Sequence, residues 1–191
     1  MNKKFGTVTH FRNKHKLLDS LIERANLESS KSEGGVFFVE FGVAFGETTK
    51  YLTSRTEAPF QYHGFDSFEG LPKAWRQLPA GAMSNNGDIP KIAGEGIYLH
   101  KGLIQDTINQ VNFESTLMKI FIFDFDLYGP TLFALKHVSS EINEGDIVYF
   151  DEAFDSDERL ILKNYFLDKF DVEVIGASSF GVAFEIKKTK V

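Results

Sequence analysis

Four acidic side chains follow two apolar segments of the sequence, and their types and spacing suggest chemistry at one shared place. Asp124 and Asp126 stand at the end of the apolar segment 119–125, and Asp151 and Glu152 directly follow the next such segment. Carboxylates gathered at one edge repel one another unless a cation or bound protons separate them. Oxygen ligands of this kind suit Mg²⁺ or another hard divalent ion. Such an ion could lower the pKa of a substrate hydroxyl while a free carboxylate takes the proton. The alternative is that the four acids cap strand ends and face water.

A second chemical signal lies earlier in the chain, where an apolar run ends in an acid and a series of small residues. Residues 36–39 are uniformly apolar, as in a strand that is buried on both faces. Glu40, Gly42, Ala44 and Gly46 then follow at alternate positions. A strand that turns sharply into a helix through small residues allows a ligand to approach the backbone and the helix N-terminus. A dinucleotide fingerprint would need glycine at positions 44 and 47, which hold alanine and glutamate. The alternative is a structural turn without a ligand.

Asp66 ends the next apolar segment, roughly 20 residues beyond the glycine turn, where Rossmann-like folds bind ribose hydroxyls. Taken alone, Asp66 could equally cap a turn. Together with the series from Glu40 to Gly46, it favours a ligand that contains adenosine.

Apolar strands and amphipathic helices alternate along the chain. We expect strands at residues 36–39, 61–66, 97–101, 119–125, 146–150, 171–177 and 180–187. We expect helices at residues 11–27, 47–56, 103–113, 131–142 and 157–170. The alternation predicts an α/β fold with a mainly parallel, Rossmann-like sheet and right-handed crossovers. The short link between the last two strands predicts an antiparallel hairpin, which completes seven strands.

We predict one domain, in which a helical extension at residues 1–35 precedes a ligand-binding domain at residues 36–191. Residues 71–96 form a long irregular insert with three of the chain's five prolines and its only tryptophan, Trp75. Such inserts are usually functional or mobile loops, so we interpret this one as a lid over the substrate.

Composition restricts the classes of function. The formal net charge of −6 argues against a broad basic surface that binds nucleic acid. We interpret the lysines at positions 14 and 16 as solvent-exposed. Without cysteine there is no disulfide, thiolate zinc site or cysteine nucleophile. Residues 1–11 lack the apolar run of a secretion signal, and no segment is long and apolar enough to span a bilayer. We therefore expect a cytoplasmic protein with no nucleic-acid or membrane partner; a homo-oligomer is left open.

The sequence resembles the macrocin O-methyltransferase-like enzymes, a branch of the class I S-adenosylmethionine (SAM) methyltransferases that acts on hydroxyls of sugars and other natural products. The resemblance is carried, in chain order, by residues 40–46 with Thr48, residues 65–72 (FDSFEGLP), Gly102 with Asp106 and Thr107, residues 124–128 (DFDLY) with Thr131, and Asp151 with Glu152. It implies the class I methyltransferase fold and O-methylation of a small hydroxyl acceptor with SAM and Mg²⁺ as cofactors.

The resemblance also implies roles for single residues. The metal ligands would be Asp124, Asp151 and Glu152, and the general base would be Asp126. The cofactor-binding residues would be Glu40, Gly42, Gly46, Thr48, Asp66, Ser67, Gly102 and Asp124. The sequence departs from the family pattern at Glu152, where a second aspartate is usual.

Three other interpretations remain. The Asp-x-Asp pair also resembles the metal site of nucleotide-sugar glycosyltransferases, although those enzymes normally lack the glycine turn after Glu40. Haloacid-dehalogenase phosphatases use an Asp-x-Asp pair too, usually on an early strand and with threonine or valine where this chain has Tyr128. The third is a methyltransferase-like domain that has lost its chemistry and serves as an interaction module.

Overall fold

The computed structural model describes residues 8–31, 34–113 and 117–190. The predictions of no secretion signal and of an extension at residues 1–35 fall partly outside these ranges. Within the described part of the chain, no helix combines the length and the apolar character needed to cross a membrane.

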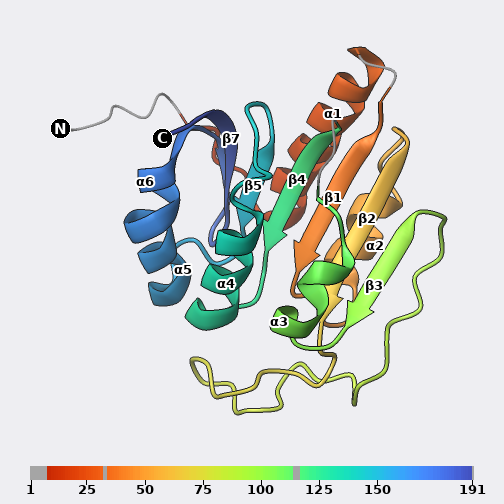
Figure 1. Ribbon diagram of the computed structural model, residues 1–191, viewed down its shortest axis with the longest axis vertical. Coiled ribbons are helices and arrows are strands. Elements are labelled where there is room, and N and C mark those ends of the chain that lie inside the picture. Colours follow the sequence, from red (N-terminus) through yellow and green to blue (C-terminus); the bar gives the residue numbers. More distant parts are fainter. Residues whose placement is uncertain (1–7, 32–33, 114–116, 191) are drawn as a thin grey trace.

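Seven strands form a single sheet, shown in Figure 1. They are β1 (Val36–Phe41), β2 (Phe60–Asp66), β3 (Ile97–Lys101), β4 (Met118–Phe123), β5 (Ile147–Phe150), β6 (Phe170–Ala177) and β7 (Val182–Thr189). The spatial order is β3-β2-β1-β4-β5-β7-β6. Strands β1 to β5 pair in parallel, and β7 runs antiparallel to both β5 and β6. The predicted α/β class, the parallel core and the terminal hairpin are confirmed.

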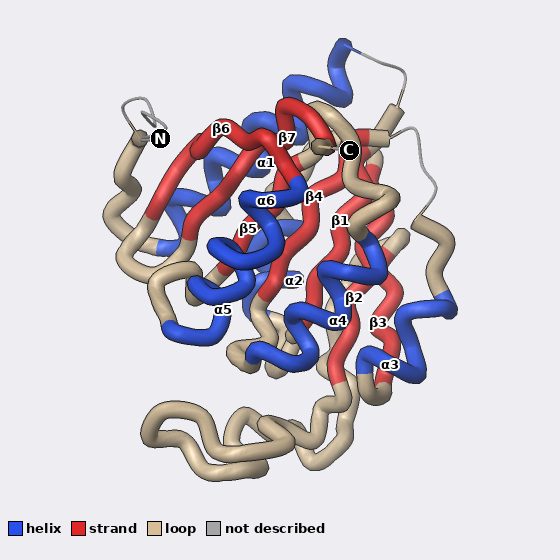
Figure 2. Tube along the Cα trace, turned by 60° about the vertical axis from the view of Figure 1, so that its left-hand side comes forward, coloured by secondary structure: helices blue, strands red, loops and turns tan. Residues whose placement is uncertain are grey.

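Helices cover both faces of the sheet, as Figures 1 and 2 show. They are α1 (Lys14–Lys31), α2 (Glu47–Thr53), α3 (Ile104–Thr107) with the 3₁₀ turn η1 (Ile108–Gln110), α4 (Tyr128–Val138), and the continuous run of α5 (Ser156–Ile161), the π-helical turn η2 (Leu162–Phe166) and α6 (Leu167–Lys169). Helices α1 and α2 lie on one face, and α3 to α6 lie on the other.

The side chains of β1 explain this layering. Phe37, Val39 and Phe41 pack in the core beneath α3 to α6, whereas Val36 and Phe38 pack in the core beneath α1 and α2. Successive strand residues point to opposite faces, so a strand covered on both faces must be apolar throughout. Each of these side chains contributes about 1.5–3 kcal/mol when it is removed from water.

The helix α1 is part of this core, because Leu17, Leu18, Leu21 and Ala25 are fully buried. It begins at Lys14, three residues later than predicted, and continues to Lys31. Its first residue lies at the carboxyl ends of β4 and β5, as the contacts of Lys14 described below show. The helix therefore brings an N-terminal residue to the edge of the sheet where ligands bind in α/β folds.

Two other boundaries differ from the prediction near the candidate site. Strand β4 ends at Phe123, so Asp124 and Asp126 lie beyond it, in the loop before α4. Helix α4 begins at Tyr128 rather than at residue 131, with Pro130 in its first turn. Proline is tolerated there because the first-turn N–H groups have no partner within the helix.

An aromatic stack on β2 and β3 contains a histidine whose titration should affect stability. His63 stacks on Phe37, Tyr98 and His100 with ring centroids 5.1, 5.0 and 5.3 Å away. Burial, followed by the neighbouring charge of His100, lowers the pKa of His63 from 6.5 to about 4. The folded state therefore disfavours a charged His63.

We expect the free energy of unfolding to fall as the pH drops from about 6.5 to about 4. In that window the unfolded chain binds a proton at residue 63 that the folded chain does not. His63→Phe keeps the ring stack but removes this contribution, so its melting temperature should fall less than that of the wild type across the window. Thermal unfolding at stepped pH measures the difference, with His15→Phe, an exposed ring stacked on Tyr51, as the control. Parallel curves for the wild type and His63→Phe would contradict the assignment.

Candidate functional site

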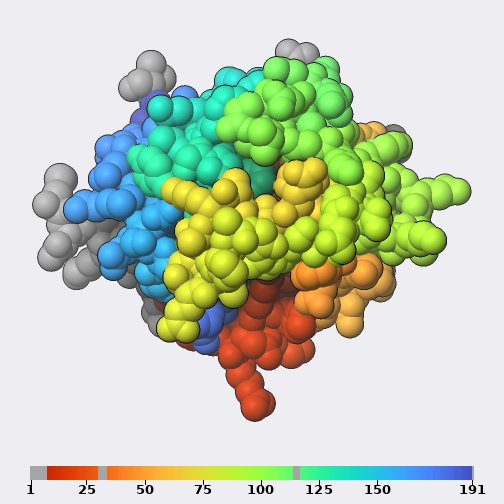
Figure 3. All heavy atoms as spheres, turned by 90° about the horizontal axis from the view of Figure 1, so that it is seen from below, coloured from red at the N-terminus to blue at the C-terminus, as the bar shows by residue number. Residues whose placement is uncertain are grey.

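A cavity of about 500 Å³ lies at the carboxyl ends of the parallel strands. Its walls come from the loops after β1, β2, β3 and β4, from the insert and from the first residue of α1. The sequence-predicted site residues that line it are Glu40, Gly42, Thr48, Asp66, Ser67, Gly102, Asp124 and Asp126. Figure 3 looks at this side of the molecule and shows the insert, in yellow and yellow-green, spread across its middle. Leu71, Pro72 and Met83 bring the insert to the cavity wall, and its role as a lid stays a prediction.

The glycines of the first turn are required by the chain's own packing. Gly42 has φ +99°, and a Cβ atom there would lie 2.0 Å from the carbonyl oxygen of Asp124. At Gly46, with φ +74°, a Cβ atom would lie 2.8 Å from Cδ1 of Ile92 in the insert. Gly46 does not line the cavity. A side chain at either position would meet the loop after β4 or the insert, and the predicted contact of these glycines with a ligand stays a prediction.

Glu40 is a buried acid with one oxygen left unpaired. It is 1% exposed, and its Oε2 accepts hydrogen bonds from the Tyr62 hydroxyl at 2.8 Å and from the Thr49 hydroxyl. Burial raises the pKa of Glu40 to about 8, although the two hydrogen bonds oppose this shift. Its Oε1 has no hydrogen-bond partner among the described residues. A buried acceptor without a partner costs about 1–3 kcal/mol, so this oxygen suits a donor from a ligand in the cavity.

Asp66 holds the glycine turn in place. Its Oδ2 accepts hydrogen bonds from the backbone N–H groups of Val43 and Ala44, both at 2.8 Å, and its Oδ1 accepts one from Phe68 at 2.7 Å. Ala44 is one of the few non-glycine residues with positive φ, at 46°, so this loop needs such support. Asp66 also lines the cavity, and its predicted contact with ribose stays a prediction.

Asp126 lies in the cavity wall in a strained backbone conformation. A strand was expected over residues 119–125, directly before Asp126, but β4 ends at Phe123 and Asp126 lies in the following loop with φ +62°. It is 9% exposed, and burial, reinforced by the charges of Asp124 and Glu152, raises its pKa to about 8. Strained residues of this kind concentrate at active sites. A carboxylate with a pKa in this range is suited to accept a proton near neutral pH.

Lys14 forms ion pairs with two of the predicted metal ligands, Asp124 and Asp151. Its Nζ lies 2.9 Å from Oδ2 of Asp124 and 3.0 Å from Oδ1 of Asp151. Although burial lowers it, the charges of the two aspartates raise the pKa of Lys14 above its ordinary value, and its ammonium group stays charged. The pKa of Asp124 is raised to about 7 by burial and by Asp151. The interpretation of Lys14 as a solvent-exposed lysine was wrong, because its side chain is only 32% exposed and is paired.

Glu152, the third predicted metal ligand, pairs with an arginine of the insert instead of with Lys14. Oε2 of Glu152 lies 2.7 Å from a guanidinium nitrogen of Arg76, and the same nitrogen lies 2.9 Å from Oδ2 of Asp155. Arg76 belongs to the insert and has φ +51°. Among the described residues, no three His, Cys, Asp or Glu side chains are grouped so that they could hold a metal ion. In this arrangement the three predicted ligands do not fit a bound Mg²⁺.

Glu158 is a further acid at the site that sequence reasoning missed. It is fully buried in α5, and its Oε2 accepts a hydrogen bond from the backbone N–H of Glu152 at 2.9 Å. Burial, followed by the charge of Asp124, holds the pKa of Glu158 well above its usual range. Its Oε1 has no partner within the described part of the chain. On an amphipathic helix rich in charged residues, no sequence signal separates a buried acid from a solvent-exposed one.

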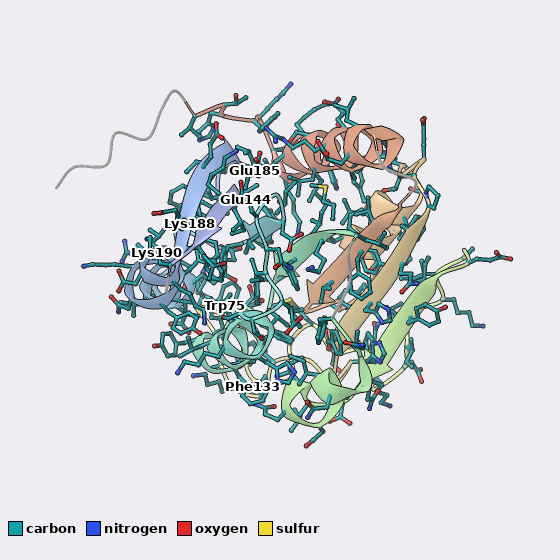
Figure 4. The ribbon with its side chains drawn as sticks, turned by 45° about the horizontal axis from the view of Figure 1, so that its top comes forward. Trp75, Phe133, Glu144, Glu185, Lys188 and Lys190 are labelled. Atoms are coloured by element: carbon teal, nitrogen blue, oxygen red, sulfur yellow. The ribbon has the colours of Figure 1, made fainter. Side chains whose placement is uncertain are left out.

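A second cavity, of about 490 Å³, lies at the opposite edge of the sheet, near the amino ends of β4 and β5. Its lining includes Glu144 and Glu185, which lie close together in Figure 4. Arg24 pairs with Glu185 there at 2.7 Å, and Lys119 pairs with Asp146 at 3.5 Å. None of the predicted site residues lies in this cavity.

The sequence matches no family model and no curated protein. Solved structures do match. The calicheamicin methyltransferase CalS11 is 19% identical with a TM-score of 0.67, over 91% of this chain and 80% of that one. A structure described as a putative rRNA methylase from Clostridium thermocellum is 13% identical with a TM-score of 0.56, over 94% of this chain and 100% of that one. The methyltransferase MycE, in complex with Mg and SAH, is 12% identical with a TM-score of 0.50, over 93% of this chain and 50% of that one. At these identities the likeness concerns the fold, and the chain has the Rossmann-like fold of class I methyltransferases.

Proposed function

We propose that this protein is a SAM-dependent methyltransferase that acts on a hydroxyl group of a small acceptor, such as a sugar or another natural product. The observation that carries the proposal is the cavity itself: Glu40, whose buried Oε1 has no partner among the described residues, lines it together with Asp66 and Asp126. The macrocin O-methyltransferase-like branch is part of this proposal, supported by the sequence motifs.

The residues present suit the cofactor. Glu40 offers an oxygen to the amino group of the methionine portion, Asp66 lies where ribose hydroxyls are bound in related folds, and Gly102 lines the same wall. When bound, SAM supplies an electrophilic methyl group on a sulfonium centre.

The chain's own task is to align the acceptor and to remove its proton. A neutral hydroxyl is a poor nucleophile, so its proton must leave as the new bond forms. Asp126 is the carboxylate in the cavity wall that would accept that proton, since Asp124 is already paired with Lys14. Positioning of the acceptor in the cavity supplies the remaining rate enhancement. The predicted Mg²⁺ takes no part in this scheme.

The walls of the cavity favour a small, uncharged acceptor. Phe45 and Leu103 line it and are 48% and 56% exposed, which provides apolar contact area at the opening. The formal net charge of −6 disfavours binding of a phosphate backbone. This argues for a sugar or phenol rather than a nucleic acid, even though an rRNA methylase shares the fold.

SAM and S-adenosylhomocysteine are expected to stabilise the protein. At about 100 times its dissociation constant, a ligand that binds only the folded state adds about 2.7 kcal/mol, or about 5–10 °C in melting temperature. Thermal unfolding with each compound, followed by calorimetry, measures the effect. NAD and a nucleotide sugar serve as comparators and should have no effect. Stabilisation by a nucleotide sugar but not by SAM would favour a glycosyltransferase, and no response to any of them would favour an inactive interaction module.

A further inference from the structure

We propose that the ammonium group of Lys14 is the resident cation of this site and takes the place of a divalent metal ion between Asp124 and Asp151. The role of Lys14 in catalysis rests on the proposed function. Whether the ammonium group or a metal ion lies between the two aspartates does not depend on that function, and it can be tested without SAM.

The geometry of Lys14 is that of a charge held between two acids. Its Nζ is within 3.0 Å of both carboxylates, whose side chains are only 20% and 16% exposed. Oδ1 of Asp151 also accepts a hydrogen bond from the hydroxyl of Tyr149, which fixes the acid from the side of β5. A buried carboxylate needs a compensating charge and hydrogen bonds, and here both acids receive them from the protein.

A divalent ion cannot share this position with the ammonium group. Mg²⁺ requires oxygen ligands at about 2.0–2.1 Å in octahedral geometry, and Lys14 already bridges the two oxygens that it would need. The third acid is compensated separately, because Arg76 of the insert contacts both Glu152 and Asp155. Each acid of the predicted metal set therefore contacts a basic side chain: Asp124 and Asp151 share Lys14, and Glu152 pairs with Arg76.

The lysine also has bonding capacity left for a ligand. An ammonium group has three N–H donors, and two of them point to Asp124 and Asp151. Lys14 lines the cavity, and within the described part of the chain its Nζ pairs with these two acids alone, so the third donor can reach an oxygen of the bound acceptor. Lys14 would then position and polarise the acceptor hydroxyl, while Asp126 accepts its proton.

Binding of Mn²⁺ to the purified full-length protein, followed by electron paramagnetic resonance without SAM, tests the proposal. The wild type is expected to bind no stoichiometric Mn²⁺ at about 1 mM. Lys14→Met removes the charge but keeps an unbranched side chain, and it should bind Mn²⁺ at least about tenfold more tightly than the wild type, because two uncompensated acids remain. The melting temperature of Lys14→Met should be lower than that of the wild type and should rise when Mn²⁺ is added.

Two further variants keep the test decisive. Lys14→Arg retains the charge, so it should fold and, like the wild type, bind no Mn²⁺. Lys16→Met alters an exposed lysine of the same helix that pairs with Asp19, and it should change neither stability nor Mn²⁺ binding. If Lys14→Met does not fold, the wild type and Lys14→Arg still decide the matter. One Mn²⁺ bound per wild-type chain would overturn the proposal. Failure of SAM to bind would overturn the proposed function alone.

Discussion

Replacing Asp126 with asparagine is expected to slow methyl transfer by about 10²–10⁴-fold while leaving the fold and the affinity for SAM nearly unchanged. The amide has almost the same shape as the carboxylate but cannot accept the acceptor's proton. Asparagine also tolerates a positive φ better than most residues, so the conformation at φ +62° should survive the substitution. Turnover with an active hydroxyl acceptor, calorimetry with SAM and a thermal melt, all on one preparation, measure the three quantities.

Asp168→Asn is a suitable control because it makes the same chemical change on an exposed residue of α6, away from the cavity. It should leave all three quantities unchanged. Near-normal turnover in Asp126→Asn would remove this residue from the mechanism. A loss of SAM affinity in step with turnover would instead assign Asp126 to the binding of the cofactor.

Gly42→Val is expected to disrupt the site by displacing the loop after β4. The new Cβ would lie 2.0 Å from the carbonyl oxygen of Asp124, in a conformation with φ +99° that β-branched residues do not adopt. Steric overlap and backbone strain each cost about 1–3 kcal/mol, so the melting temperature should fall by at least about 5 °C. Affinity for SAM should drop more than tenfold, because Asp124 and Asp126 leave their positions in the cavity wall.

The matched control is Gly129→Ala in the first turn of α4. A Cβ atom there meets nothing within 4 Å, so the melting temperature and SAM binding should both be preserved. The experiment also separates two reasons for the glycine at position 42. If Gly42→Val melts like the wild type but no longer binds SAM, the glycine serves the ligand, as the sequence suggested, and not the packing of the chain.

The architecture could be predicted from the sequence because it depends on local patterns. Strands buried on both faces are largely apolar, and β1, β4 and β5 show this in their residues, with Glu40 and Lys119 as the charged exceptions. Segment order then limits the topology, since parallel strands need crossovers and a short link forces a hairpin. Boundaries were less accurate, as at Tyr128, because one turn more or less of helix is decided by packing and by the groups that cap it.

The position of the site was also predictable. Glu40 and Asp66 lie in the last two residues of their parallel strands and Asp124 directly follows one, and such strand ends meet at one edge of the sheet. The reason for the glycines was not predictable, because the atom that excludes a side chain from position 42 belongs to Asp124, which is distant in sequence and close only in the folded chain.

The sequence by itself determined the fold class and the edge of the sheet at which the candidate site lies, because periodicity and strand order carry that information. Only the tertiary structure decided how the acids at that edge are neutralised. Lys14 reaches Asp124 across 110 residues, and Arg76 reaches Glu152 across 76. Neither pair leaves a pattern in the sequence, since it depends on the direction of α1 and on the path of the insert. The charge of a buried acid is set by the atoms within a few ångströms of it, and those neighbours exist only once the chain has folded.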